Sequence, residues 1–167
     1  MSTAETRPEP APGTLGAALA LAEDWHAGQV DKLGAPYIEH VRRVVDRVAA
    51  IAPADVRDAA QVAAALHDTV EDCDGVTLDV LSDHGFAPEV VAAVDSVTKR
   101  PGEDYDDLIG RAAADRVGRW VKLADNLDNS DPARARSLRL RTRFRLARRY
   151  RRARKVLAAH GAVAPMG

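Results

Sequence analysis

Residues 54–72 read ADVRDAAQVAAALHDTVED. Small apolar side chains recur in this stretch at spacings of three and four, as on one face of a helix: Val56, Ala60, Ala63 and Ala64. Pro53 in front of the stretch and Asp74-Gly75 behind it are typical of helix ends. We therefore predict one buried helix over residues 54–72, with the polar run HDTVED at its carboxyl end.

The polar run at residues 67–72 combines an imidazole with three carboxylates. On a continuous helix, residues four apart share a face, so His67 should lie beneath Glu71 and Asp68 beneath Asp72. His67 and Asp68 can then offer a nitrogen and an oxygen to one metal ion, while Glu71 and Asp72 act on water. This pattern favours metal-assisted hydrolysis, in which the cation lowers the pKa of its bound water and a carboxylate orients it. The alternative is an ordinary polar helix end.

Helical spacing continues through most of the remaining chain, and no alternating strand pattern of useful length occurs. The other expected helices cover about residues 15–25, 37–51, 77–85, 88–99, 103–114, 116–128 and 131–160. We therefore predict an all-α fold with one helical-bundle domain. Its expected boundaries are a flexible N-terminal tail over residues 1–13, a domain over residues 14–160 and a C-terminal tail over residues 161–167.

Composition indicates a globular protein of one domain. The chain has 167 residues, with 24 Lys and Arg against 25 Asp and Glu. Its single cysteine, Cys73, excludes an internal disulfide. No apolar stretch approaches the roughly 20 residues of a membrane-spanning helix, and residues 1–13 lack the apolar segment of a signal peptide. We therefore expect a cytoplasmic enzyme without a membrane partner.

Two further segments add candidate metal ligands. Asp125 lies beside the apolar face of the helix over 116–128, where a carboxylate is costly unless it is paired or metal-bound. Lys122 is expected to pair with it only poorly, so the alternative role is a cap on another helix. His40 follows a turn and lies between inward-facing apolar residues. With His67 and Asp68, these residues form a set of two imidazoles and two carboxylates, which suits manganese, iron or zinc.

Several short motifs, taken in their order along the chain, resemble those of the HD superfamily of metal-dependent phosphohydrolases. The resemblance is greatest to the hydrolase domain of Rel/SpoT-type enzymes and to the small alarmone hydrolases. The resemblance extends from about Leu15 to Asn129. Its matching pieces are His26-Ala27-Gly28-Gln29, Lys32, Gly34, Pro36-Tyr37 with His40, residues 67–72, Val97-Thr98-Lys99, and residues 122–125 with Asn129.

The resemblance implies a function and a role for each matching residue. It places one divalent metal, usually Mn²⁺, with Fe²⁺ or Zn²⁺ as alternatives, on His40, His67, Asp68 and Asp125. It assigns water activation and proton relay to Glu71 and Asp72, and nucleotide contacts to Lys32 and Asn129. The implied substrate is the nucleotide (p)ppGpp, cleaved at its 3′-pyrophosphate.

Three positions depart from the family pattern. Asp31 stands where an arginine usually stacks on guanine, Asp128 replaces the His of a Leu-His-Asn motif, and Pro132 stands where Thr is frequent. We expect all three to lie where substrate binds, with none touching the metal ligands, and Asp31 to place a negative charge facing the nucleotide. Other substrates therefore stay open, including NADPH and nucleoside phosphates.

Basic residues are concentrated after position 133. They are Arg134, Arg136, Arg139, Arg141, Arg143, Arg145, Arg148, Arg149, Arg151, Arg152, Arg154 and Lys155. One interpretation is a solvated outer helix face, and another is a set of arginines that hold substrate phosphates near the metal. A third is a non-catalytic module that binds a nucleotide or a nucleic acid through its phosphates.

Overall fold

The computed structural model describes residues 10–132 and 140–164. The described chain is all-helical, with an isolated β-bridge between Val30 and Pro36 and no strand. The helices are α1 (Leu15–Trp25), α2 (Tyr37–Ile51), α3 (Ala54–Leu66), α4 (Thr69–Asp72), α5 (Leu78–Asp83), α6 (Pro88–Val97), α7 (Tyr105–Ala114), α8 (Gly118–Asn129) and α10 (Leu140–Ala159). The predicted all-α class is confirmed. None of these helices has the length and apolar character needed to cross a membrane.

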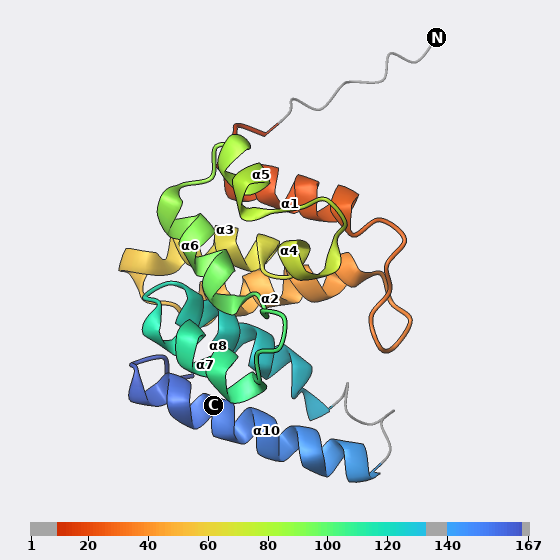
Figure 1. Cartoon of the computed structure of the whole chain (residues 1–167), viewed down its shortest axis with the longest axis vertical. Coiled ribbons are helices and arrows are strands. Elements are labelled where there is room, and N and C mark those ends of the chain that lie inside the picture. The colour runs from red at the N-terminus through yellow and green to blue at the C-terminus, as the bar shows by residue number, and fades with distance from the viewer. Residues whose placement is uncertain (1–9, 133–139, 165–167) are drawn as a thin grey trace.

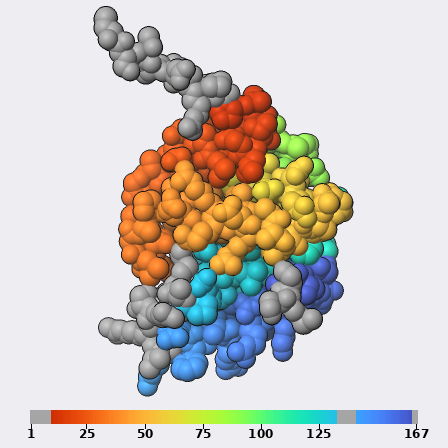
Figure 2. Space-filling model, turned by 180° about the vertical axis from the view of Figure 1, so that it is seen from behind, coloured from red at the N-terminus to blue at the C-terminus, as the bar shows by residue number. Residues whose placement is uncertain are grey.

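Helix α3 lies at the centre of the bundle, in contact with α1, α2, α6 and α8 (Figure 1). Along the long axis of the molecule, α1 and α5 lie at one end and α10 crosses the other end, where it packs on α7 and α8. Seen from behind, α2 and α3 cross the middle of the molecule, between α1 and α10 (Figure 2). The small buried side chains of α3, such as Ala60 and Ala63, allow its neighbours to approach closely.

Several helix starts are explained by local capping chemistry. The Thr77 hydroxyl accepts a hydrogen bond from the Val80 N–H and caps α5, and Pro88 opens α6 at its first position. Helix α8 begins at Gly118, two residues later than expected. Residues 133–139, where the last helix was expected to begin, lie outside the described part of the chain, as do residues 1–9 and 165–167 of the two predicted tails.

The predicted single helix over residues 54–72 is wrong in one respect, because it breaks at His67 and Asp68. The Thr69 hydroxyl donates to the Leu66 carbonyl at 2.8 Å, and the His67 Nδ1–H donates to the Ala64 carbonyl at 2.8 Å. These side-chain donors satisfy carbonyls at the end of α3 that lack a backbone partner. The break directs His67 and Asp68 toward α2 and α8.

The close approach of α8 to α6 gives a test of packing. A Cβ added at Gly118 would lie 2.0 Å from the Ser96 Oγ and 3.2 Å from the Ala93 carbonyl oxygen, and Ser96 is buried and donates to that carbonyl. Gly118→Ala should therefore lower the free energy of unfolding by about 1–3 kcal/mol. Gly110→Ala is the control, since the added Cβ meets no described atom within 4 Å beyond its chain neighbours and its own helix backbone, and the change should stabilise α7 by about 0.5–1 kcal/mol. Urea denaturation measures both, and equal effects of the two variants would contradict this packing.

Candidate metal centre and active site

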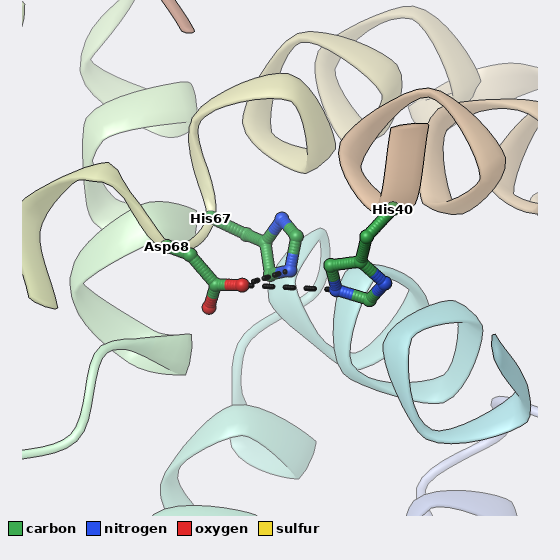
Figure 3. A group of neighbouring side chains, drawn as sticks. All are labelled: His40, His67 and Asp68. Atoms are coloured by element: carbon green, nitrogen blue, oxygen red, sulfur yellow. Dashed lines mark ion pairs between the residues drawn. The ribbon is translucent and has the colours of Figure 1, made fainter. Parts of the chain in front are cut away.

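Side chains from three regions converge at the centre of the bundle. His40 comes from α2, His67 and Asp68 from the junction of α3 and α4, and Asp125 from α8. The His67 Nε2 lies 2.9 Å from the Asp68 Oδ2 and 4.0 Å from the Asp125 Oδ1. The His40 Nε2 lies 3.7 Å from that Asp68 oxygen and 3.6 Å from that Asp125 oxygen. Figure 3 shows both imidazoles and the Asp68 carboxylate pointing toward one another. The structure thus gathers His40, His67 and Asp68 into one cluster that could hold a metal ion, and Asp125 approaches that cluster from the side of the two imidazoles.

The hydrogen bonds of the two histidines leave the same ring nitrogen of each for a metal. The His67 Nδ1 donates to the Ala64 carbonyl, and the His40 Nδ1 donates to the Asp128 Oδ2 at 2.8 Å. With Nδ1 protonated, each Nε2 presents a lone pair to the cluster. Among the described residues, the buried His67 Nε2 makes no hydrogen bond of good geometry, although the Asp68 Oδ2 lies 2.9 Å from it. A buried nitrogen in this state fits a bound cation, because an unpaired polar atom is otherwise costly.

The charges of the cluster also favour a cation. Burial lowers the pKa of His67, but the carboxylates of Asp68 and Asp125 outweigh this effect and raise it to about 9. In the metal-free protein, the site therefore attracts a proton to the position where a metal would bind.

Lys122 pairs well with Asp125, contrary to the sequence-based expectation. Both side chains are buried, and the Lys122 Nζ lies 3.1 Å from the Asp125 Oδ2. Residues three apart on a helix are neighbours, and the long lysine side chain reaches along α8 to the carboxylate one turn further on. Although burial lowers the pKa of Lys122, Asp125 and Asp68 raise it above its usual value. Lys122 thus holds one oxygen of Asp125, while the other oxygen faces the imidazoles.

Glu71 and Asp72 line the pocket beside this cluster without joining it. The Glu71 Oε2 accepts a hydrogen bond from the Lys99 backbone N–H at 3.0 Å, which fixes the carboxylate against the segment after α6. Partial burial raises the pKa of Asp72, and the neighbouring charges of Asp68 and Glu71 raise it further. A carboxyl group with a raised pKa is suited to accepting and returning a proton.

The pocket has a volume of about 470 Å³ and includes both predicted substrate contacts, Lys32 and Asn129. The Asn129 Nδ2 donates to the Asp125 Oδ1, so Asn129 also borders the metal cluster. The remaining wall includes Arg149 of the basic run and residues to which the sequence analysis gave no role: Tyr37, Lys99, Tyr105, Leu146 and Tyr150. The pocket thus places lysines and an arginine around the carboxylates.

The basic run divides between several environments. Arg149 lines the pocket and lies 3.6 Å from the centre of the Tyr105 ring. Arg154 donates to Asn126 on α8 at 2.9 Å, and Arg152 pairs with Asp106 on α7 at 2.8 Å. The other described members are mostly exposed. Arg134, Arg136 and Arg139 lie outside the described residues.

The sequence analysis expected Asp31 to place a negative charge facing the nucleotide, but in the structure its carboxylate is engaged by its own loop and by Arg43. Although the residue borders the pocket, only 4% of its side chain is exposed. One carboxylate oxygen accepts the N–H groups of Leu33 at 2.8 Å and Ala35 at 3.1 Å. The other oxygen lies 3.8 Å from Arg43. The carboxylate stabilises its own loop because Asp side chains readily accept hydrogen bonds from backbone groups a few residues ahead.

Asp128 also differs from the expectation, because it touches the metal cluster. Its side chain is fully buried and accepts the His40 Nδ1–H. Although burial raises the pKa of the Asp128 carboxyl, the contacts with His40 and Arg43 outweigh this effect and hold it below its usual value. The one available sequence signal was that Asp128 lies three residues after Asp125 on a helix, which places the two on neighbouring positions.

Two other histidines lie away from the cluster. His26 is buried, and its Nδ1 pairs with the Gln29 Oε1 at 2.8 Å at the start of the loop before α2. His84 is the C-cap residue of α5. The buried Cys73 thiol lies 3.4 Å from the His26 ring.

The comparisons with known proteins agree with this geometry. The HD domain family matches residues 18–160. A probable GTP pyrophosphokinase of Mycobacterium leprae is 38% identical over 121 residues, which cover 67% of this chain and 15% of that protein. A guanosine-3′,5′-bis(diphosphate) 3′-pyrophosphohydrolase of Aquifex aeolicus is 33% identical over 120 residues, which cover 67% of this chain and 16% of that protein. The matched region is thus about one sixth of these curated relatives.

The fold is also found in a solved structure of a metazoan ortholog of SpoT that hydrolyzes ppGpp. The TM-score is 0.75 at 24% sequence identity, and the match covers 95% of this chain and 90% of that chain. The family match extends beyond Asn129, where the sequence resemblance ended, and includes α10. The chain belongs to the HD domain family and is related to the ppGpp hydrolase domains of Rel/SpoT proteins.

Proposed function

We propose that this protein is a metal-dependent phosphohydrolase that acts on a nucleotide, with (p)ppGpp as the favoured substrate and the 3′-pyrophosphate as the group removed. The observation that carries the proposal is the convergence of the His40 and His67 Nε2 atoms with carboxylate oxygens of Asp68 and Asp125. Mixed imidazole and carboxylate ligands suit Mn²⁺, with Fe²⁺ and Zn²⁺ as alternatives. The similarity to ppGpp hydrolases supports the substrate class.

The proposed chemistry divides between the metal and the pocket. A bound divalent cation would make a water more acidic and polarise a phosphoryl oxygen. In this proposal, Glu71 and Asp72, which line the same pocket, would orient that water and accept its proton. The cationic groups of Lys32, Lys99 and Arg149 line the same pocket and would attract the phosphates. The water oxygen would add to phosphorus as the bond to the ribose 3′-oxygen breaks, and the proton taken from the water would return to that oxygen, so ppGpp and water would yield GDP and pyrophosphate.

A hydrolysis panel tests the substrate. Metal-free protein is incubated with Mn²⁺ and either ppGpp, pppGpp, NADPH or common nucleoside phosphates, and the products are separated by chromatography. We expect GDP from ppGpp and GTP from pppGpp, each with pyrophosphate, and no turnover after chelation. Preferential release of phosphate from NADPH or a nucleoside phosphate would keep the hydrolase but replace its substrate. Nucleic-acid binding without any hydrolysis would favour the non-catalytic alternative.

The affinity for Mn²⁺ should depend on pH. Because Asp68 and Asp125 raise the pKa of His67 to about 9, the metal-free site holds a proton at lower pH. Metal binding must release that proton, so affinity should rise with pH until about 9 and by about tenfold per pH unit for one released proton. Isothermal titration between pH 6.5 and 8.5 measures this slope. A flat profile would contradict metal binding at the His67 nitrogen.

A further inference from the structure

We propose that Asp128 is a positioning residue for His40, and that Arg43 links it to Asp31, so that one charge network holds both the metal centre and the loop over residues 29–36. The inference rests on the proposed metal site. It goes beyond that site by assigning a role to three residues that do not themselves bind the metal or the water.

The first contact lies directly behind the metal-binding nitrogen of His40. The Asp128 Oδ2 accepts the His40 Nδ1–H at 2.8 Å, with the Asp128 side chain fully buried. This bond fixes the ring orientation and the tautomer that leaves Nε2 free. A carboxylate in this position also makes the imidazole a stronger donor, and loss of such a partner typically weakens metal binding by about 10–100-fold.

The second contact is the pair of arginines that compensates the buried charge of Asp128. The Arg43 Nε donates to the Asp128 Oδ1 at 3.0 Å and its terminal nitrogen to the Oδ2 at 3.3 Å. The Arg47 Nε donates to the Oδ1 at 3.4 Å. His40, Arg43 and Arg47 lie three and four residues apart on α2 and therefore share one face. A neutral side chain at position 128 would leave these arginines without the buried charge that they face.

The third contact reaches the loop at the pocket. The same Arg43 terminal nitrogen lies 3.8 Å from the Asp31 Oδ2, while the other Asp31 oxygen accepts the Leu33 and Ala35 amides. The loop supplies Lys32 to the pocket. Arg43 therefore has two functions: it supports the carboxylate behind His40 and anchors the loop that places Lys32.

Asp128→Asn tests the metal half of the proposal, because asparagine keeps the size and a hydrogen-bond acceptor but removes the charge. By isothermal titration with Mn²⁺, this variant should bind about 10–100-fold more weakly than wild type. Asp131→Asn is the matched control, since Asp131 pairs with Arg47 at 3.1 Å and, within the described part of the chain, neither pairs with His40 nor lines the pocket. It should bind Mn²⁺ like wild type. In NMR spectra of the metal-free proteins, the His40 Nδ1–H signal should move in Asp128→Asn only.

Arg43→Gln tests the link and needs no change at the buried carboxylate. It should weaken Mn²⁺ binding in the same direction as Asp128→Asn and also speed hydrogen exchange at the Leu33 and Ala35 amides, whereas Asp131→Asn should do neither. Wild-type Mn²⁺ affinity in both Asp128→Asn and Arg43→Gln would overturn the inference and leave the proposed function intact. A wild-type protein that binds no Mn²⁺ would overturn both. If Asp128→Asn does not fold, the Arg43→Gln result decides.

Discussion

Asp68→Ala should keep the helical fold but lose bound Mn²⁺ and hydrolysis. The substitution removes the oxygen that lies 2.9 Å from the His67 Nε2 and 3.7 Å from the His40 Nε2, together with half of the carboxylate charge that attracts a cation. Metal catalysis contributes several kcal/mol to transition-state stabilisation, so we expect the rate to fall by at least about 10³-fold. Elemental analysis and an initial-rate assay measure the two losses, and circular dichroism checks the fold.

The control for this variant is Asp83→Ala. Asp83 and His84 repeat the His/Asp chemistry at the end of α5, where Asp83 is exposed and neither residue lines the pocket. The metal content and the hydrolysis rate of Asp83→Ala should equal those of the wild type. Full metal content in Asp68→Ala would show that the cation binds elsewhere.

Glu71→Gln should separate metal binding from chemistry. Glutamine can still accept the Lys99 N–H that holds Glu71 at 3.0 Å, so the side chain should keep its place while losing its ability to take a proton. General acid–base assistance is worth about 10²–10⁴-fold, and we expect kcat to fall by that factor with Mn²⁺ affinity unchanged. Steady-state kinetics and isothermal titration measure the two quantities.

Asp74→Asn is the matched variant for Glu71→Gln. Asp74 is exposed close to Glu71 in the sequence but does not line the pocket, so removal of its charge should leave kcat unchanged. Near-normal turnover in Glu71→Gln would remove Glu71 from the mechanism, and Asp72 would then be the remaining candidate for the base.

Much of the fold could be predicted because helical periodicity and end signals are local. Thr77, Pro88 and the apolar spacing of α3 each act within a few residues of themselves. The break between α3 and α4 could not be read in this way. It depends on whether the His67 and Thr69 side chains turn back to the carbonyls of α3, which a polar sequence permits but does not require.

The candidate site shows the same limit at longer range. His40 and Asp125 were identified from their apolar neighbours in the sequence, because burying a polar or charged side chain is costly unless it is paired or bound to a metal. This argument uses only local sequence. The partner of Asp128 is 88 residues away in the chain, and no spacing rule connects the two. The sequence-based expectation that the Asp31 charge faces the nucleotide failed for a similar reason. Asp31 and Arg43 become neighbours only in the folded chain, and the loop conformation that brings the Leu33 and Ala35 amides to Asp31 is not evident from the sequence.

Helix α10 illustrates why composition alone left several interpretations open. Its arginines look alike in the sequence, yet Arg149 lines the pocket and Arg154 donates to Asn126 on α8. Their different environments arise from the packing of α10 across α7 and α8, and that packing also brings Tyr150 into the pocket wall.

The most direct test of the central claim is the initial rate of pyrophosphate release from ppGpp as Mn²⁺ is titrated into metal-free protein. The account predicts no release without metal, followed by a rise that saturates at one Mn²⁺ per chain. Release at the full rate without metal, or no release at saturating Mn²⁺, would contradict the assignment of His40, His67, Asp68 and Asp125 as the metal centre of a ppGpp hydrolase.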